Sequence, residues 1–226
     1  MSLILNIDTA TEKAHVSFAK NGMVLHSLFS DSQKEHASFL QSAIQQLTKV
    51  TGIPLSAIDA VAITSGPGSY TGLRVGFSSA KGLSYALNKP LITLGTLEIL
   101  TASAIHFLPH IDDQVLFCPM MDARRMEVYT AIYKKELTPI LSPSALILDE
   151  FSFNKELLSH KILFFGSGSE KWKAICKNSN AIFENVLILP EAMSRSSNML
   201  FLKNHFTELV YSEPAYLKEF QTVIKK

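Results

Sequence analysis

Short runs of apolar residues near the start of the chain predict three strands. Residues 3–7, 14–19 and 24–29 are apolar or loosely alternating, and Asn21-Gly22 joins the second run to the third. An Asn-Gly pair between two such runs is a strong hairpin signal, because both residues accept the positive φ angles of a tight turn. We therefore expect the chain to open with an antiparallel meander of three strands.

Further along the chain, apolar runs alternate with segments of helical spacing. The other predicted strands are residues 60–64, 91–94, 115–120, 127–133, 145–148, 162–165 and 186–189. The predicted helices are residues 32–50, 72–88, 96–107, a short helix around Trp172, and 196–210. This order predicts an α/β fold. A polar, turn-rich stretch at 109–114 divides it into two subdomains, residues 1–108 plus 196–226 and residues 109–195.

Two of the predicted helices carry more apolar surface than one core requires. Ser32 and Glu35 form a capping box for the first of them, whose core face is Ala37, Leu40, Ile44 and Leu47. A second face of the same helix carries Phe39, Ala43 and Val50. The helix at 72–88 has a core face of Leu73, Phe77, Ala80, Ser84 and Leu87, and a second face of Val75, Ser79, Gly82 and Ala86.

The second face of the helix at 72–88 consists of small or short side chains. Gly76 and Gly82 also lie inside this helix, and each costs about 1 kcal/mol relative to alanine. Close approach of another backbone would offset that cost. The approaching helix could belong to the same chain or to a partner protein, and the spacing alone does not decide between them.

Two glycine-rich turns and one acidic hairpin are candidates for holding a nucleotide. Asp8, Thr9 and Thr11 follow the first strand, and Gly66-Pro67-Gly68 and the turn from Gly166 to Gly168 each join a strand to a helix. Their spacing is neither the P-loop nor the dinucleotide-binding pattern. Turn formation alone accounts for these residue types, and we favour that interpretation.

Arg124 and Arg125 lie in the turn between two predicted strands. Two adjacent guanidinium groups could clamp an anion or a carboxylate. Charged residues are also common at hairpin tips, where they need no function.

Composition narrows the classes of function. The chain has 226 residues, of which 47% are hydrophobic and 18% charged, with a net charge of +1. This argues against disorder and against a basic surface that binds nucleic acid on its own. Cys118 and Cys176 form no CxxC pair and suit a reducing compartment. No segment has the pattern of a signal peptide or a membrane span, so we expect a cytoplasmic protein.

Four motifs, taken in order, resemble the bacterial TsaB (YeaZ) family. They are IDTAT at 7–11, SGPGSYTGLRVG at 65–76, MDARRMEVY at 121–129 and EPAYLK at 213–218, and they span nearly the whole chain. The resemblance implies an actin-like ATPase fold of the sugar-kinase and Hsp70 class, with two subdomains of RNase-H-like topology. It also implies a role in making threonylcarbamoyladenosine (t6A) at position 37 of tRNA.

The resemblance further implies which molecules this chain meets. In that family TsaB is not the catalyst; it pairs with its paralogue TsaD, which transfers the threonylcarbamoyl group, and the ATPase TsaE is another partner. A homodimer is implied for the chain alone, with tRNA contacted only through the complex and ATP or ADP bound, if at all, within it. The candidate partner interface is Phe39, Ala43, Val50, Val75, Ser79, Gly82 and Ala86.

Two departures from related enzymes favour a non-catalytic role. In TsaD, two metal-binding histidines follow the glycine-loop helix, and the matching positions here hold Thr96 and Leu100. Neither side chain can supply an imidazole ligand, so we expect no metal site and no catalytic residue. Kinases of this fold also have glycine where the first hairpin has Ala10.

Three other functions remain as alternatives to the non-catalytic role. The main one is an actin-like ATPase or kinase that uses Asp8, Thr9, Thr11, Gly166 and Gly168. A metallopeptidase and a tRNA-binding module acting alone are weaker alternatives.

Overall fold

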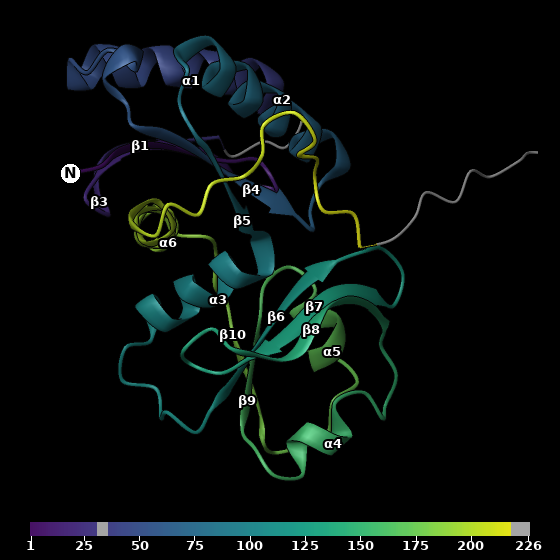
Figure 1. The fold of residues 1–226 in the computed structure, drawn as a ribbon. Helices are drawn as coiled ribbons and strands as arrows, with labels where there is room; N and C mark the ends of the chain where they lie inside the picture. Colours follow the sequence, from purple (N-terminus) through teal and green to yellow (C-terminus); the bar gives the residue numbers. More distant parts are fainter. Residues whose placement is uncertain (31–35, 218–226) are drawn as a thin grey trace, which may run out of the picture.

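The first sheet combines an antiparallel meander with two parallel strands. The computed structural model describes residues 1–30 and 36–217. Strands β1 (Leu3–Asp8), β2 (Ala14–Lys20) and β3 (Met23–Ser30) form the predicted meander. Strands β4 (Ala60–Gly66) and β5 (Leu91–Gly95) extend the sheet in parallel, in the order β3-β2-β1-β4-β5 (Figure 1).

The second sheet repeats the pattern of the first. Its antiparallel strands are β6 (Leu116–Asp122), β7 (Glu127–Tyr133) and β8 (Pro139–Ile147), and its parallel strands are β9 (Ile162–Phe165) and β10 (Ala181–Glu184). The strand order is β8-β7-β6-β9-β10, which matches β3-β2-β1-β4-β5 of the first sheet strand by strand. Strand β6 thus takes the place of β1, and β9 takes the place of β4. The two sheets confirm the predicted α/β fold, and their repeated topology agrees with the two-subdomain actin-like class that the resemblance implies.

The helices form layers around the two sheets. Helices α1 (His36–Thr51) and α2 (Tyr70–Leu87) cover the outer face of the first sheet, with a short 3₁₀ turn at Leu55–Ala57 after α1. Helices α3 (Thr96–Phe107) and α6 (Pro190–Leu202) lie between the sheets (Figure 1). The short helices α4 (Asn154–Leu157) and α5 (Ser169–Lys173) belong to the second half.

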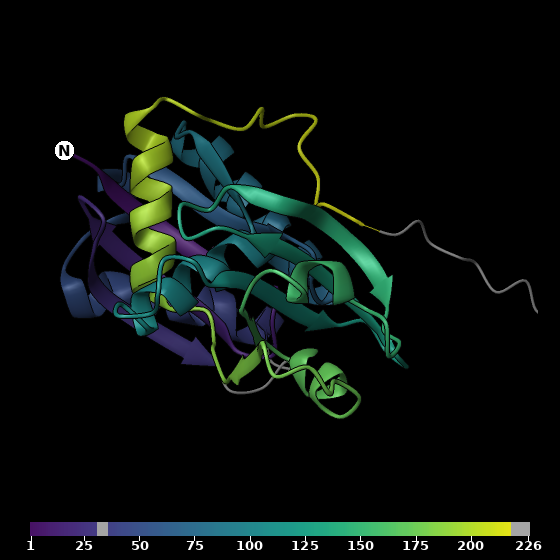
Figure 2. The ribbon, with the colours of Figure 1, turned by 90° about the horizontal axis from the view of Figure 1, so that it is seen from below.

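The helix α6 differs from the predicted helix at 196–210. It begins at Pro190, which suits the first helical position because proline needs no N–H partner there, and it ends at Leu202. Figure 2 shows it lying across the first sheet. Its buried face includes Ser194 and Ser197, and both contact Asn6 of β1. A helix whose buried face is partly polar gives little apolar periodicity, and the prediction was therefore wrong about where it starts.

In the second half, one strand prediction was wrong and another gave too short a strand. The segment 186–189 is no strand, because β10 pairs with β9 through Ala181–Glu184, while Val186 and Ile188 pack into the core between the sheets. The strand expected at 145–148 is the longer β8, which begins at Pro139. Proline is tolerated there because β8 is an edge strand. Among the residues the structure describes, no helix is long and apolar enough to cross a membrane.

Candidate functional site

The first glycine-rich turn packs directly on the β1–β2 hairpin. The Ser69 N–H donates to the Ala10 carbonyl at 2.8 Å, and a Cβ on Gly68 would lie 2.5 Å from that carbonyl oxygen. The Thr9 hydroxyl donates to the Gly72 carbonyl at 2.7 Å. These contacts account for glycine in this turn and occupy the hydroxyl of Thr9 within the chain itself.

Gly76 is also explained within the chain. A Cβ on Gly76 would clash with the Thr9 hydroxyl and lie 3.0 Å from a methyl carbon of Ile63 in β4. The close approach that offsets the cost of this helical glycine is therefore the approach of α2 to the first sheet. Thr11 plays no comparable part, since its hydroxyl donates to the nearby Lys13 carbonyl at 3.0 Å.

Asp8 is buried at the end of β1 and bonded to its own chain. One carboxylate oxygen accepts from the Thr64 hydroxyl at 2.6 Å and from the Ala10 N–H at 3.0 Å. The other lies 3.7 Å from Nδ1 of His15 and has no hydrogen-bond partner in the described residues. His15 is itself buried and its Nε2 has no partner there either. Burial lowers the pKa of His15, although the charges of Asp8 and Glu191 oppose this change.

The buried His15 predicts a loss of stability at mildly acidic pH. Because its folded-state pKa lies below 6.5, the unfolded chain takes up a proton more readily than the folded chain does. Stability is thus full above pH 6.5 and falls as the pH drops from there through the folded pKa, by at most about 1.4 kcal/mol per pH unit.

Urea unfolding between about pH 7.5 and 5.5 measures this slope. The variant His15→Asn should show a shallower slope, since it removes the titrating group. Equal slopes for the two proteins would contradict the assignment.

The second glycine-rich turn serves packing in the same way as the first. Gly166 has a φ of +92°, and a Cβ there would lie 2.5 Å from the Met120 carbonyl oxygen and 2.9 Å from a methyl carbon of Leu100. The Gly168 N–H donates to the same Met120 carbonyl at 3.0 Å. This turn therefore packs on β6, as the first packs on the β1–β2 hairpin.

Arg124 and Arg125 form the tip of the β6–β7 hairpin, with φ angles of +71° and +49°. Both are exposed, and neither guanidinium has an ion-pair partner in the described residues. The nearby Asp122 instead pairs with Lys171 at 3.0 Å. Partial burial raises the pKa of Asp122, but the Arg124 N–H and Lys171 outweigh this effect and leave it lowered.

Buried residues occupy the two positions that hold metal-binding histidines in TsaD. Thr96 is fully buried with no hydrogen-bond partner for its hydroxyl among the described residues, and Leu100 belongs to the core between the sheets. Its contact with Gly166 places an apolar side chain against the second turn. The described residues contain no group of three or more His, Cys, Asp or Glu side chains that could hold a metal ion. Thr96 and Leu100 therefore do not supply the imidazole ligands that a metal site at these positions would need.

The structure divides the seven predicted interface residues on α1 and α2 into three sets. Ala43 is buried in the core beneath the helices, so its assignment to an outward face was wrong. Phe39, Val75 and Ser79 are half-buried, and the Gln41 side chain donates to Ser79 at 3.2 Å, so α1 itself covers part of this face. Val50, Gly82 and Ala86 are exposed.

Three residues of the predicted first helix are exposed where burial was expected or lie outside the described residues. Ala37, expected in the core, is exposed. The capping residues Ser32 and Glu35 lie outside the described residues.

Gly82 is the helical glycine that the chain does not explain. A Cβ there would have no atom within 4 Å. Ser78, Tyr85 and Ala86 lie about one helical turn before or after Gly82, and all three are exposed. The exposed fraction of Tyr85 is 81%. Sequence reasoning missed Tyr85, although an aromatic residue beside small ones on a helix surface is a recognisable signal for a protein contact.

The outward surface of these helices has few charges. Lys49 is the only Asp, Glu, Lys or Arg in α1, and α2 has only Arg74 and Lys81. Both cations of α2 are engaged by the C-terminal segment: Lys81 donates to the carbonyls of Val210 and Ser212, and Arg74 to the Tyr216 hydroxyl. We call the exposed side of α1 and α2, with Val50, Gly82, Tyr85 and Ala86, the two-helix surface.

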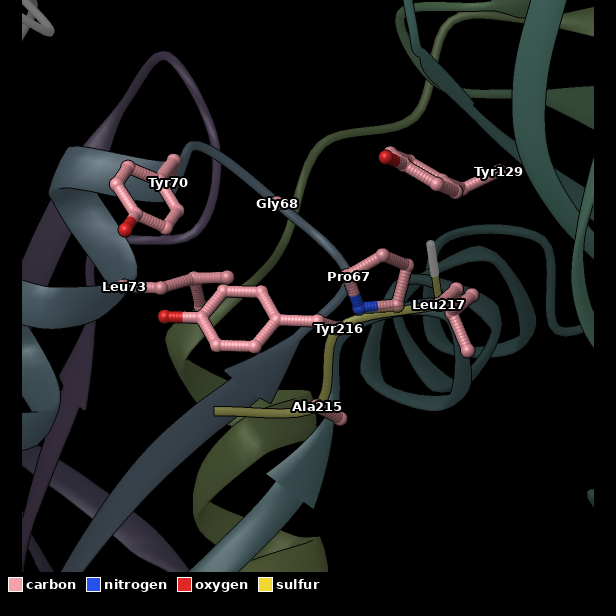
Figure 3. Close-up of a pocket in the computed structure, with 8 residues that line it drawn as sticks. All are labelled: Pro67, Gly68, Tyr70, Leu73, Tyr129, Ala215, Tyr216 and Leu217. Carbon is pink, nitrogen blue, oxygen red and sulfur yellow. The ribbon is translucent and has the colours of Figure 1, made fainter. Parts of the chain in front are cut away.

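A small pocket lies where the end of the described chain meets the first glycine-rich turn. The Ala215 N–H donates to the Ser65 carbonyl at 2.7 Å. Figure 3 shows Tyr216 and Leu217 beside Pro67, with Tyr129 of the second half nearby. The cavity is about 130 Å³, and its wall is Pro67, Gly68, Tyr70, Leu73, Tyr129, Ala215, Tyr216 and Leu217. The described part of the motif at 213–218 thus packs against the first glycine-rich turn. Lys218 lies outside the described residues.

Comparisons with known proteins agree on one family. The family model for TsaD, tRNA N6-adenosine threonylcarbamoyltransferase, matches residues 28–224. The tRNA threonylcarbamoyladenosine biosynthesis protein TsaB of Escherichia coli is 29% identical over 222 residues, which are 95% of this chain and 94% of that protein.

Solved structures extend the comparison. A Pseudomonas aeruginosa protein described as similar to peptidase YeaZ has a TM-score of 0.82 at 25% identity, covering 96% of this chain and 100% of that one. An inorganic polyphosphate/ATP-glucomannokinase from Arthrobacter has a TM-score of 0.53 at 11% identity, covering 91% of this chain and 100% of that one, and shows only the shared fold. The chain therefore belongs to the TsaB (YeaZ) family, within the wider group that the TsaD model describes.

Proposed function

We propose that this chain is a non-catalytic subunit of the machinery that makes t6A in tRNA, and that it pairs with TsaD through the two-helix surface. The names of its relatives support the pathway. In this proposal TsaE is a further partner, tRNA is contacted only through the complex, and the chain alone forms a homodimer through the same surface in the cytoplasm. A nucleotide, if one takes part, belongs to the complex.

The observation that carries the pairing is Gly82. It lies on the exposed side of α2, and no atom lies within 4 Å of its Cβ position. The residues about one helical turn away on the same side, Ser78, Tyr85 and Ala86, are uncharged. Nothing in the described chain offsets its cost of about 1 kcal/mol. Depletion of charge is the compositional mark of an interface core, and small residues let two helices approach closely. A helix of a partner protein would provide the missing contact.

Thr96 and Leu100 support the non-catalytic part of the proposal. A transferase that needs two histidines at these positions would lack its metal ligands here, and Leu100 is committed to the core. The ATPase alternative gains no specific support, because Asp8, Thr9, Gly166 and Gly168 are each engaged in packing or hydrogen bonds within the chain.

The variant Gly82→Ala tests the proposal with two readouts that should move in opposite directions. At a protein concentration low enough to keep the chain monomeric, the variant should gain about 1 kcal/mol in its free energy of unfolding, because alanine is the better helix former and its methyl group enters open space in the monomer. The affinity for TsaD should fall, because the same methyl group separates two closely packed helices. Chemical unfolding and calorimetric titration with TsaD measure the two effects. A stabilised variant that binds TsaD as tightly as the wild type would refute contact at Gly82.

A further inference from the structure

After α6 the chain continues along the edge of the first sheet. The Thr207 N–H donates to the Leu91 carbonyl at 2.8 Å, and the Thr207 hydroxyl accepts from the Thr93 N–H at 3.2 Å. These bonds pair the segment with β5, which is the edge strand. We call residues 207–217 the C-terminal strap; it is the yellow segment that passes beside α2 in Figure 1.

The strap is then fastened along α2. The Lys81 ammonium donates to the Val210 carbonyl at 3.1 Å and to the Ser212 carbonyl at 2.9 Å, so it holds the residues on both sides of Tyr211. Leu209 packs into the core beneath the helices. The central part of the strap thus has a fixed position beside the turn of α2 that contains Lys81 and leads to Tyr85.

A second attachment holds the end of the strap near the start of α2. The Arg74 guanidinium lies 4.0 Å from the centre of the Tyr70 ring and donates to the Tyr216 hydroxyl at 3.4 Å. The Tyr70 and Tyr216 ring centres are 5.7 Å apart. Both cations of α2 therefore bind the strap, and the residues of α2 between them carry no charge.

With these attachments, two apolar residues of the strap remain in solvent. Val210 is 72% exposed and Tyr211 is 81% exposed, although Leu209 beside them is packed. Exposed tyrosines are common anchors in protein interfaces, since they bury a large area at a small entropic cost. The charged residues of the described strap, Glu208 and Glu213, lie on either side of this uncharged stretch.

We infer that the strap is a third element of the partner surface, and that Val210 and Tyr211 contact TsaD alongside Tyr85. This inference rests on the proposed function. The face of α2 that carries Gly82 lies between two neighbours: α1, which reaches Ser79, and the strap, which is held by Lys81. A partner helix that approaches Gly82 therefore meets both.

The area that a stable pair must bury supports the same conclusion. Helix α2 has 18 residues, which gives a length of about 27 Å and, with a width of about 10 Å, a footprint of roughly 270 Å². A stable interface buries about 800 Å² on each partner. One helix supplies only part of this area. The strap supplies additional surface that is apolar, fixed in place and continuous with α2.

The variant Tyr211→Asp tests this inference by titration of the full chain with TsaD. The affinity should fall at least about tenfold, as expected for loss of an aromatic anchor, while the melting temperature of the isolated chain stays unchanged. Leu158→Asp is the matched control, because Leu158 is 84% exposed on the second half and should have no effect on pairing. Wild-type affinity in Tyr211→Asp would overturn the inference.

A second variant tests the role of Lys81 as a positioning residue. Lys81→Met removes both bonds to the strap while keeping the length of the side chain, and should weaken pairing; Lys81→Arg, which retains donors, should restore it. If Lys81→Met pairs as the wild type does, the strap needs no fixed position and the inference fails. Gly82→Arg in the same assay separates this failure from failure of the proposed function, since that variant addresses α2 alone.

Discussion

Replacing Gly82 by arginine is expected to abolish pairing with TsaD and to leave the isolated chain folded. The side chain enters open space in the monomer, where no atom lies within 4 Å of the Cβ position, and arginine is a good helix former. In the complex the same side chain would separate the helices and place an unpaired charge in an apolar contact, so the affinity should fall more than about 100-fold.

Titration calorimetry with TsaD and thermal unfolding of the isolated variant measure these two effects. Met199→Arg is the matched control, because Met199 is exposed on α6, which lies on the opposite face of the first sheet. That variant should pair normally. If Gly82→Arg pairs as tightly as Met199→Arg, the two-helix surface is not where TsaD binds.

Replacing Gly76 by alanine is expected to destabilise the chain itself, whereas alanine at Gly82, six positions away, should stabilise it. The added methyl group would overlap the Thr9 hydroxyl, which is buried and bonded to the Gly72 carbonyl. Relief of the overlap requires α2 to move away from the sheet or Thr9 to lose its bond. We expect a loss of about 3 kcal/mol in the free energy of unfolding.

Urea unfolding of Gly76→Ala, Thr9→Ala and the double variant measures this loss and its cause. Thr9→Ala removes the overlapping atom, so the double variant should lose less stability than the sum of the two single losses. Additive losses would show that Thr9 is not the obstacle. A Gly76→Ala variant as stable as Gly82→Ala would contradict the distinction between the two glycines.

The elements that sequence predicted well are those whose buried faces are apolar. The core face of α2 follows a regular helical period, and four of its five predicted residues are fully buried. The meander followed from Asn21-Gly22, whose Asn has the positive φ that such a turn requires. Helix α6 was displaced because serines line much of its buried face, and Ala43 was misplaced because α1 packs on both the sheet and α2.

The candidate site was only partly accessible to sequence reasoning. The small residues of α2 suggested a close contact, but only the folded structure distinguishes Gly76, whose Cβ position meets its own chain, from Gly82, whose Cβ position does not. The strap has no apolar period to detect, because Lys81 holds it through backbone carbonyls. Side-chain patterns carry no information about such bonds.

The mass of the assembly in solution tests the central claim most directly. Size-exclusion chromatography with light scattering would be run on this chain alone, on TsaD from the same organism alone, and on their mixture. The account predicts that the chain alone has the mass of a homodimer and that the mixture gives one peak with the mass of a one-to-one heterodimer. Two separate peaks with the masses of the unmixed proteins would contradict it.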